Sequence, residues 1–143
     1  MTFSFGQSDN ERIEIDVLRY ERNPIGDYHD DNWLVTETRA CVGGFRCKVG
    51  ASVLTDELVR FLPQLRSLFE TLRGSAEFLT LEGQLRLHLV GDGKGNIEMR
   101  GELADRPGDG NRLHFNLQFD QSQLGESISE LEKVISEFPV RSV

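Results

Sequence analysis

The sequence predicts an α+β domain, because two kinds of apolar spacing occur along a chain of single-domain size. Several segments alternate apolar and polar residues, as strands with one buried face do, and two segments carry an apolar stripe at helical spacing. The length of 143 residues and the 38% hydrophobic content suit one globular core. We therefore expect one domain, residues 1–143, with about seven to eight antiparallel strands in one or more sheets and two amphipathic helices.

Strands are predicted wherever the apolar period is two. The inward positions are Ile13, Ile15 and Val17; Cys47, Val49, Ala51 and Val53; Leu85, Leu87 and Leu89; Ile97, Met99, Gly101 and Leu103; and Leu113, Phe115, Leu117 and Phe119. Two more strands are expected at Trp33–Val42 and Ala76–Leu81. Hairpin turns are expected at Gly43-Gly44, Glu82-Gly83 and Gly91 to Gly95.

The first helix is predicted over Thr55–Leu72. Its apolar stripe contains Leu58, Phe61, Leu62, Leu65, Leu68, Phe69 and Leu72. Thr55 can cap the first amides, and Gly74 can adopt the left-handed conformation that ends a helix. Pro63 removes one helical hydrogen bond, so we expect a kink there or a short helix followed by a second one.

The second helix is predicted from Ser122 to Phe138, just before Pro139. Leu124, Ile128, Leu131, Val134, Ile135 and Phe138 face inward, whereas Glu126, Glu130, Glu132 and Glu137 face outward with only Lys133 among them. A shift of 66 positions (113 minus 47) superimposes this helix and its preceding strand on the first helix and its strand. This register indicates a strand-rich-plus-helix unit used twice, roughly 11–74 and 76–139; the alternative is that any strand-turn-helix gives such a match.

The charge balance disfavours nucleic acid as a direct partner. Sixteen Lys and Arg against twenty-four Asp and Glu give a net charge of -8, which repels phosphates. Such a surface serves solubility, or it complements a basic protein. The sequence shows no basic segment followed by an apolar run at its start, and no stretch of eighteen apolar residues, so we expect a cytoplasmic protein without a membrane partner.

Motifs for catalysis or cofactors are not found, so we expect no enzymatic activity and no cofactor. Cys41 and Cys47 form no Cys-x-x-Cys or Cys/His cluster, and Cys47 is expected as small core filler. His88 and His114 occupy outward strand positions, which favours exposed histidines on a sheet face. The glycine-rich segment from Gly91 to Gly95 joins two strands and opens no helix, so it does not predict a phosphate site.

Two polar loops contain the candidate contact residues. Asp27, His29, Asp30 and Asp31 lie close together in the first loop, which could bind a hard cation but lacks the order of a calcium loop. Capping of the turn by Asp and Asn is the favoured interpretation, with the rings of Tyr28 and Trp33 buried at its edges. The candidates for partner binding in both loops are Asp27, Tyr28, Asp30, Asp31, Trp33, Glu102, Asp105 and Asp109. Together the two loops could form an acidic rim.

Over nearly its whole length the chain resembles bacterial immunity proteins of the WapI type. The matching phrases are Gly26-Asp27-Tyr28 with Asp30, Asn32, Trp33 and Leu34; Gly44-Phe45; Glu82-Gly83 with Leu85 and Leu87; Asp105, Gly108, Gly110, Asn111 and Leu113; Asp120-Gln121 with Leu124; and Phe138-Pro139. His29 stands where an aromatic such as Trp is expected, and Ser122-Gln123 stands where Thr-Tyr is usual. These departures indicate a divergent member.

The resemblance implies a small antidote that binds the toxic C-terminal domain of a contact-delivered or polymorphic toxin. Such domains are often nucleases, whose active sites are basic because they hold phosphates, and an acidic protein can occlude them. Two alternatives stay open at this point. One is a structural or regulatory module that self-associates through an exposed strand edge or the outer helix face. The other is a small-molecule-binding or hydrolytic domain with a pocket that holds histidine and carboxylate together.

Overall fold

The computed structural model describes residues 1–142 and confirms an antiparallel α+β architecture. Eight strands form two four-stranded sheets, with the orders β1-β2-β3-β4 and β5-β6-β7-β8. The strands are β1 (Thr2–Ser8), β2 (Glu11–Tyr20), β3 (Trp33–Val42), β4 (Phe45–Leu54), β5 (Arg73–Leu79), β6 (Leu85–Asp92), β7 (Asn96–Ala104) and β8 (Arg112–Asp120), and the helices are α1 (Tyr28–Asp31), α2 (Thr55–Thr71) and α3 (Gln121–Glu137). The sequence analysis missed β1 and the four-residue helix α1. Among residues 1–142, no helix is long and apolar enough to cross a membrane.

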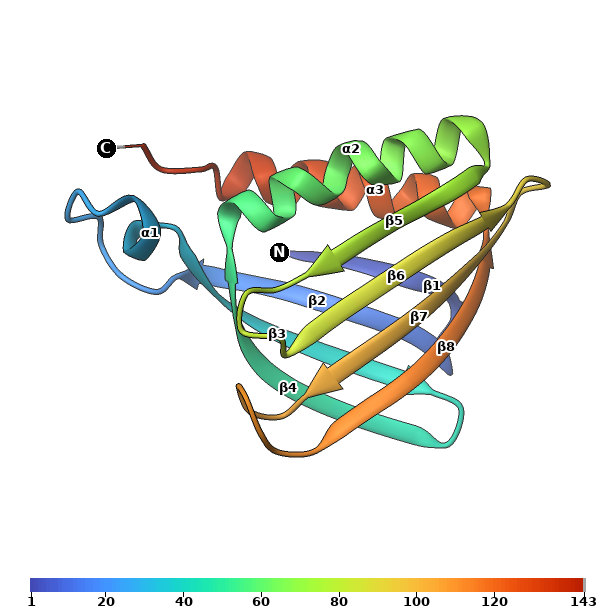
Figure 1. Cartoon of the computed structure of the whole chain (residues 1–143), viewed down its shortest axis with the longest axis horizontal. Coiled ribbons are helices and arrows are strands. Elements are labelled where there is room, and N and C mark those ends of the chain that lie inside the picture. The colour runs from blue at the N-terminus through green and yellow to red at the C-terminus, as the bar shows by residue number, and fades with distance from the viewer. Residues whose placement is uncertain (143) are drawn as a thin grey trace.

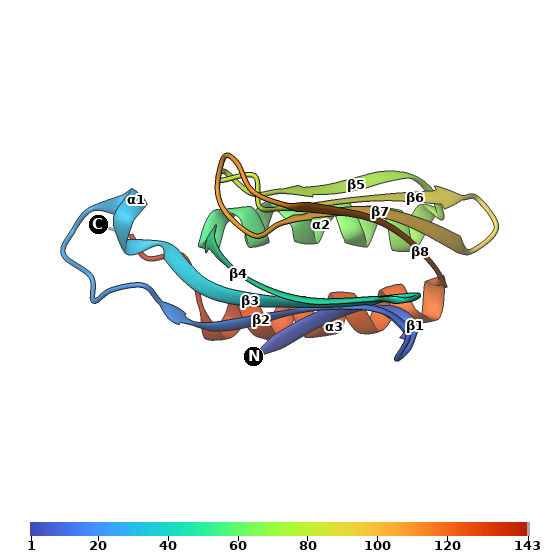
Figure 2. The same ribbon diagram turned by 90° about the horizontal axis from the view of Figure 1, so that it is seen from below.

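The two sheets stack face to face, and α2 and α3 lie along one side of the stack (Figures 1 and 2). Each helix crosses to the other half of the chain: α2 follows β4 but packs against β5, whereas α3 follows β8 but packs against β1. The two helices also pack against each other. One hydrophobic cluster therefore joins both sheets and both helices, and its aromatic centre includes Phe61 stacked on Phe78 at 5.1 Å between ring centroids.

Apart from the short α1 between β2 and β3, the same order of elements occurs twice, since four strands and a 17-residue helix are followed by four strands and a 17-residue helix. The helices α2 and α3 have equal length, and their first residues are 66 positions apart (121 minus 55), as are their last (137 minus 71). The repeated elements begin at Thr2 and Arg73, whereas the sequence pattern indicated units of roughly 11–74 and 76–139. We infer that residues 1–142 form one domain from a unit used twice; Val143 lies outside the described residues.

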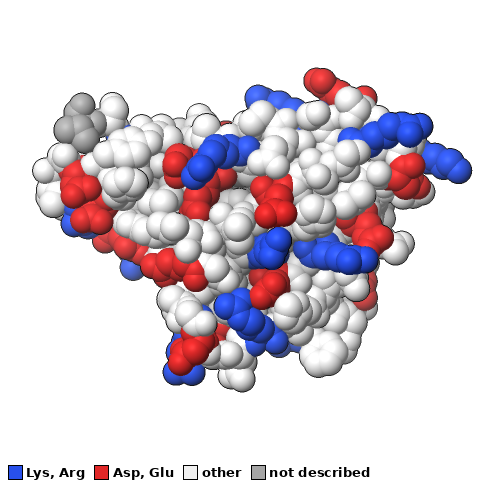
Figure 3. Space-filling model, in the orientation of Figure 1, with Lys and Arg blue, Asp and Glu red and all other residues white. Residues whose placement is uncertain are grey.

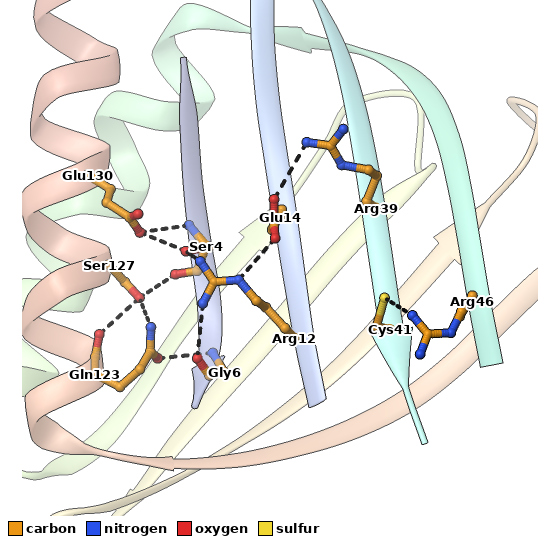
Figure 4. A network of polar contacts seen from close by, with 10 residues as sticks. All are labelled: Ser4, Gly6, Arg12, Glu14, Arg39, Cys41, Arg46, Gln123, Ser127 and Glu130. Atoms are coloured by element: carbon orange, nitrogen blue, oxygen red, sulfur yellow. Dashed lines mark hydrogen bonds and ion pairs between the residues drawn. The ribbon is translucent and has the colours of Figure 1, made fainter. Parts of the chain in front are cut away.

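The free edge of β1 is closed by side chains of α3 (Figure 4). The amide of Ser4 donates to Glu130 Oε1 at 3.0 Å, and the amide of Gly6 donates to Gln123 Oε1 at 3.1 Å. Ser127 Oγ donates to the carbonyl of Ser4. Glu130 was expected to face outward, but it is half-buried because it satisfies this strand edge, which would otherwise expose unpaired backbone groups.

Side chains of α2 close the free edge of β5 in the second sheet in the same way. Gln64 Oε1 accepts a hydrogen bond from the amide of Glu77 in β5 at 2.9 Å, and Glu57 Oε2 accepts one from the amide of Leu81 just after β5 at 2.7 Å. Residues 57 and 64 lie 66 positions before Gln123 and Glu130 (123 minus 57; 130 minus 64). The same spacing of 66 residues therefore relates the polar side chains that close the two sheet edges.

Three local expectations for α2 need correction. The helix runs unbroken through Pro63, whose missing hydrogen bond lies on the exposed side where water can reach the carbonyl. Thr55 does not cap the helix; Glu57 Oε1 accepts from the amide of the N-cap residue Leu54 at 2.7 Å instead. The C-cap is Leu72, with a left-handed φ of 61°; Gly74, which was expected to end the helix, also has a positive φ of 89° but lies in β5.

Candidate functional site

The loop between β2 and β3 is organised by its own polar side chains, as the sequence predicted. Asp27 is the N-cap of α1 and accepts a hydrogen bond from the amide of Asp30 at 3.2 Å. Asn32 Nδ2 donates to the carbonyl of Tyr28 at 2.6 Å, and Asn32 Oδ1 accepts from the hydroxyl of Thr55 at 2.7 Å. The side-chain amide group of Asn32 therefore fixes α1 to the start of α2.

Asp31 is buried beneath this loop, so its position does not suit a partner contact. Its two carboxylate oxygens accept hydrogen bonds from the amides of Ile25 at 2.9 Å and Gly26 at 2.8 Å. The bond from Ile25 is the main reason why the pKa of Asp31 lies below its usual value, and the bond from Gly26 and the guanidinium of Arg22 at 3.5 Å add to it. Asp31 positions the loop, whereas the neighbouring Asp30 is exposed, 3.4 Å from Arg22.

Tyr28 does not bury its ring as expected. It is 43% exposed on α1, while Trp33 is half-buried at the start of β3, opposite Leu54 of β4. Tyr28 lines a pocket of about 410 Å³ between α1, the start of α2 and the β5–β6 turn. The residues around this pocket, hereafter the α1 pocket, are Tyr28, His29, Asn32, Leu54, Asp56, Glu57, Arg60, Leu79, Thr80 and Leu81.

Glu57 forms a buried part of the wall of the α1 pocket. Burial raises the pKa of Glu57, opposed by the hydrogen bonds that it accepts from the amides of Leu54 and Leu81. Oε1 thus caps the start of α2, and Oε2 holds α2 to the β5–β6 turn. Asp56 and Arg60 stand beside it and pair with each other at 3.1 Å, so the cation there is already neutralised.

The acidic β7–β8 turn does not adjoin the acidic loop around α1. Figure 1 shows the β7–β8 turn at the bottom of the view and α1 at the left, so the two loops form separate surfaces instead of one continuous rim. Asp105 accepts from the amide and side chain of Asn111 at 2.9 and 3.0 Å, and the side-chain bond is the main cause of the lowered pKa of Asp105. The side chain of Asp109 is 87% exposed in this turn and lies 3.9 Å from Arg106.

Glu102 belongs to a third feature, the outer face of the second sheet. Its carboxylate accepts from Arg112 at 2.6 Å and lies 3.9 Å from His114, while His88 lies 3.1 Å from Glu77. These pairs border a shallow hollow of about 330 Å³. The histidines face outward as predicted, but the sequence did not reveal their carboxylate partners, because each partner is on a neighbouring strand. Within residues 1–142 no three His, Cys, Asp or Glu side chains are grouped to hold a metal ion.

The comparison with protein-family models decides the family. The model described as "Immunity protein WapI-like family" matches residues 4–139 of the chain. The chain belongs to this family. The resemblance inferred from the sequence phrases is therefore confirmed, and membership implies an immunity protein directed against a bacterial toxin. No curated protein matches the chain.

The phrase Gly26-Asp27-Tyr28 with Asp30 and Asn32, one of several on which the family resemblance rested, builds α1, and Tyr28 and Asn32 contribute to one wall of the α1 pocket in this WapI-like protein. The opposite wall was missed by the sequence analysis. Leu79 and Leu81 were predicted within the strand Ala76–Leu81; Leu79 is the last residue of β5, Leu81 lies just beyond it, and both side chains are exposed. A usable signal was present, because Leu79 and Leu81 are two large apolar residues just before the turn at Glu82-Gly83.

Proposed function

We propose that this WapI-like protein neutralises the C-terminal domain of a cognate toxin by binding it stoichiometrically and covering its active surface. It acts by binding without catalysing a reaction, and it acts in the cytoplasm. The family match over residues 4–139 carries the proposal. The net charge of -8 supports it, since an acidic body attracts a toxin with a basic, phosphate-holding active site such as that of a nuclease.

The α1 end of the molecule is the proposed contact surface. Asp27 and Asp30 are exposed there beside the ring of Tyr28, which combines charge for attraction with an aromatic side chain for anchoring. Asp31 and the half-buried Trp33 support this surface from below. The other candidates, Glu102, Asp105 and Asp109, belong to the second sheet and its turn, and they contact the toxin only if it extends beyond α1.

The test is a titration of the toxin domain encoded beside this gene with the purified protein. Inhibition should be complete at one equivalent. The variant Asp30→Lys should associate about fivefold more slowly and with a weaker salt dependence, because steering by charge acts mainly on the association rate. Asp9→Lys, an exposed charge reversal in the β1–β2 turn, is the matched control and should lose less than twofold. Full toxin activity in the presence of excess protein would overturn the proposal.

A homodimer is the alternative that one observation favours. The outer edge of β4 pairs with no strand in the described residues, and Phe45 at its start is 65% exposed. Unpaired strand edges with apolar neighbours are templates for association. Light scattering separates the two accounts, because the toxin-binding proposal predicts a monomer of 16.2 kDa at micromolar concentration and the alternative predicts twice that mass.

A further inference from the structure

We propose that the α1 pocket is the anchor site for one large apolar side chain of the toxin, with a lysine or arginine of the toxin next to it. This inference rests on the proposed function and names the part of the surface that supplies most of its binding energy.

Exposed apolar side chains converge on this pocket from two separate parts of the chain. Tyr28 on α1 is 43% exposed, and Leu79 and Leu81 at the β5–β6 turn are 53% and 71% exposed. Single exposed apolar residues are ordinary on a protein surface, but several around one hollow mark an interaction site. The volume of about 410 Å³ leaves room for a large side chain to be withdrawn from water.

The walls of the pocket are held in place before any partner arrives. Glu57 ties the start of α2 to the amide of Leu81, and Asn32 ties α1 to the hydroxyl of Thr55. Both bonds are 2.7 Å long and formed by buried acceptors. A preorganised pocket loses little conformational entropy on binding, which is the condition under which one anchor residue contributes strongly.

The charges beside the α1 pocket favour a cationic residue next to the apolar side chain of the toxin. Asp27 and Asp30 are exposed on the α1 side, where Arg22 lies 3.4 Å from Asp30. On the α2 side Asp56 pairs with Arg60, and the buried Glu57 adds a further carboxyl group, so carboxyl groups outnumber cations around the pocket. In Figure 3, acidic atoms over α1 and at the start of α2 lie on either side of uncharged surface. This arrangement favours an apolar residue flanked by Lys or Arg and repels an acidic segment.

The variant Leu81→Arg tests the inference, with the inactivated toxin domain encoded beside this gene as the probe. The Leu81 side chain is mostly exposed and its amide still donates to Glu57, so the variant should fold like the wild type, as checked by its urea unfolding midpoint. Its dissociation constant for the toxin should rise about 30-fold or more, the effect of losing a binding hot spot. Phe45→Arg on β4, a similarly exposed apolar residue away from the pocket, is the matched control and should bind like the wild type.

The outcomes separate the inference from the function on which it rests. If the wild type does not bind the toxin domain, the proposed function fails. If the wild type binds and Leu81→Arg binds equally well, the function stands and the anchor pocket is wrong. If Phe45→Arg alone weakens binding, the contact lies at the β4 edge and the inference is also wrong.

Discussion

Replacing Gln123 by Met tests how the helices protect the sheet edges. Gln123 is buried, and its Oε1 is the acceptor for the buried amide of Gly6. Met has nearly the same shape but no acceptor, so the variant leaves one buried N–H without a partner. Ser127 loses the donor Gln123 Nε2 at 3.0 Å but keeps its bond to the carbonyl of Ser4.

The expected loss of unfolding free energy follows from this one buried N–H group without a partner. One buried, unsatisfied backbone donor costs about 1–3 kcal/mol of unfolding free energy. With a urea dependence of about 2 kcal/mol per molar for a small protein, the unfolding midpoint should fall by about 0.5–1.5 M.

Urea denaturation followed by circular dichroism measures this shift, and Gln118→Met provides the matched control. Gln118 carries the same side chain on the exposed face of β8, so its substitution should change the unfolding free energy by less than about 0.5 kcal/mol. Equal midpoints for the two variants would show that the bond to Gly6 contributes nothing measurable, and the account of the protected β1 edge would then be wrong.

Further variants test packing and the α1 loop. Gly101→Ala should destabilise the fold by about 1–3 kcal/mol, since its Cβ would lie 2.1 Å from the ring of Phe115, and Phe115→Leu in the same chain should recover part of the loss in a thermal melt. Asp31→Asn should be less stable than the wild type at neutral pH. Because the pKa of Asp31 is lowered by folding, this difference should persist above about pH 4 and vanish as the pH falls through the folded-state pKa, as urea midpoints at pH 2 to 7 would show; a difference that is constant with pH would contradict it. Asp30→Asn, an exposed neighbour without a backbone partner for its side chain, is the control and should leave the midpoint nearly unchanged.

The regular elements were predictable because their apolar period is strong. The strand Trp33–Val42 was predicted with its observed bounds, and α3 differs by one residue at each end. β1 was missed although Phe3 and Phe5 alternate with polar residues and are fully buried, because the segment is short and precedes a turn. Local periodicity identifies elements of this kind but not which strand edge a helix will cover.

The candidate site was predictable only in part, since it is built from distant segments. The sequence indicated Asp27, Tyr28 and Asp30 as one cluster, and they do lie together on the α1 loop. It did not indicate that Asp31 is buried, because that depends on the path of Ile25 and Gly26 over its carboxylate. Nor did it place the β5–β6 turn opposite α1, which follows from the packing of α2 against β5.

Hydrogen–deuterium exchange of the protein, alone and in complex with the toxin domain, tests the central claim most directly. The account predicts slower exchange in residues 25–33, 54–60 and 79–82 on complex formation, because these segments surround the α1 pocket. Residues 45–51 of β4 should exchange at the same rate in both states. Protection confined to β4 or to the outer face of the second sheet, with the α1 segments unchanged, would contradict it.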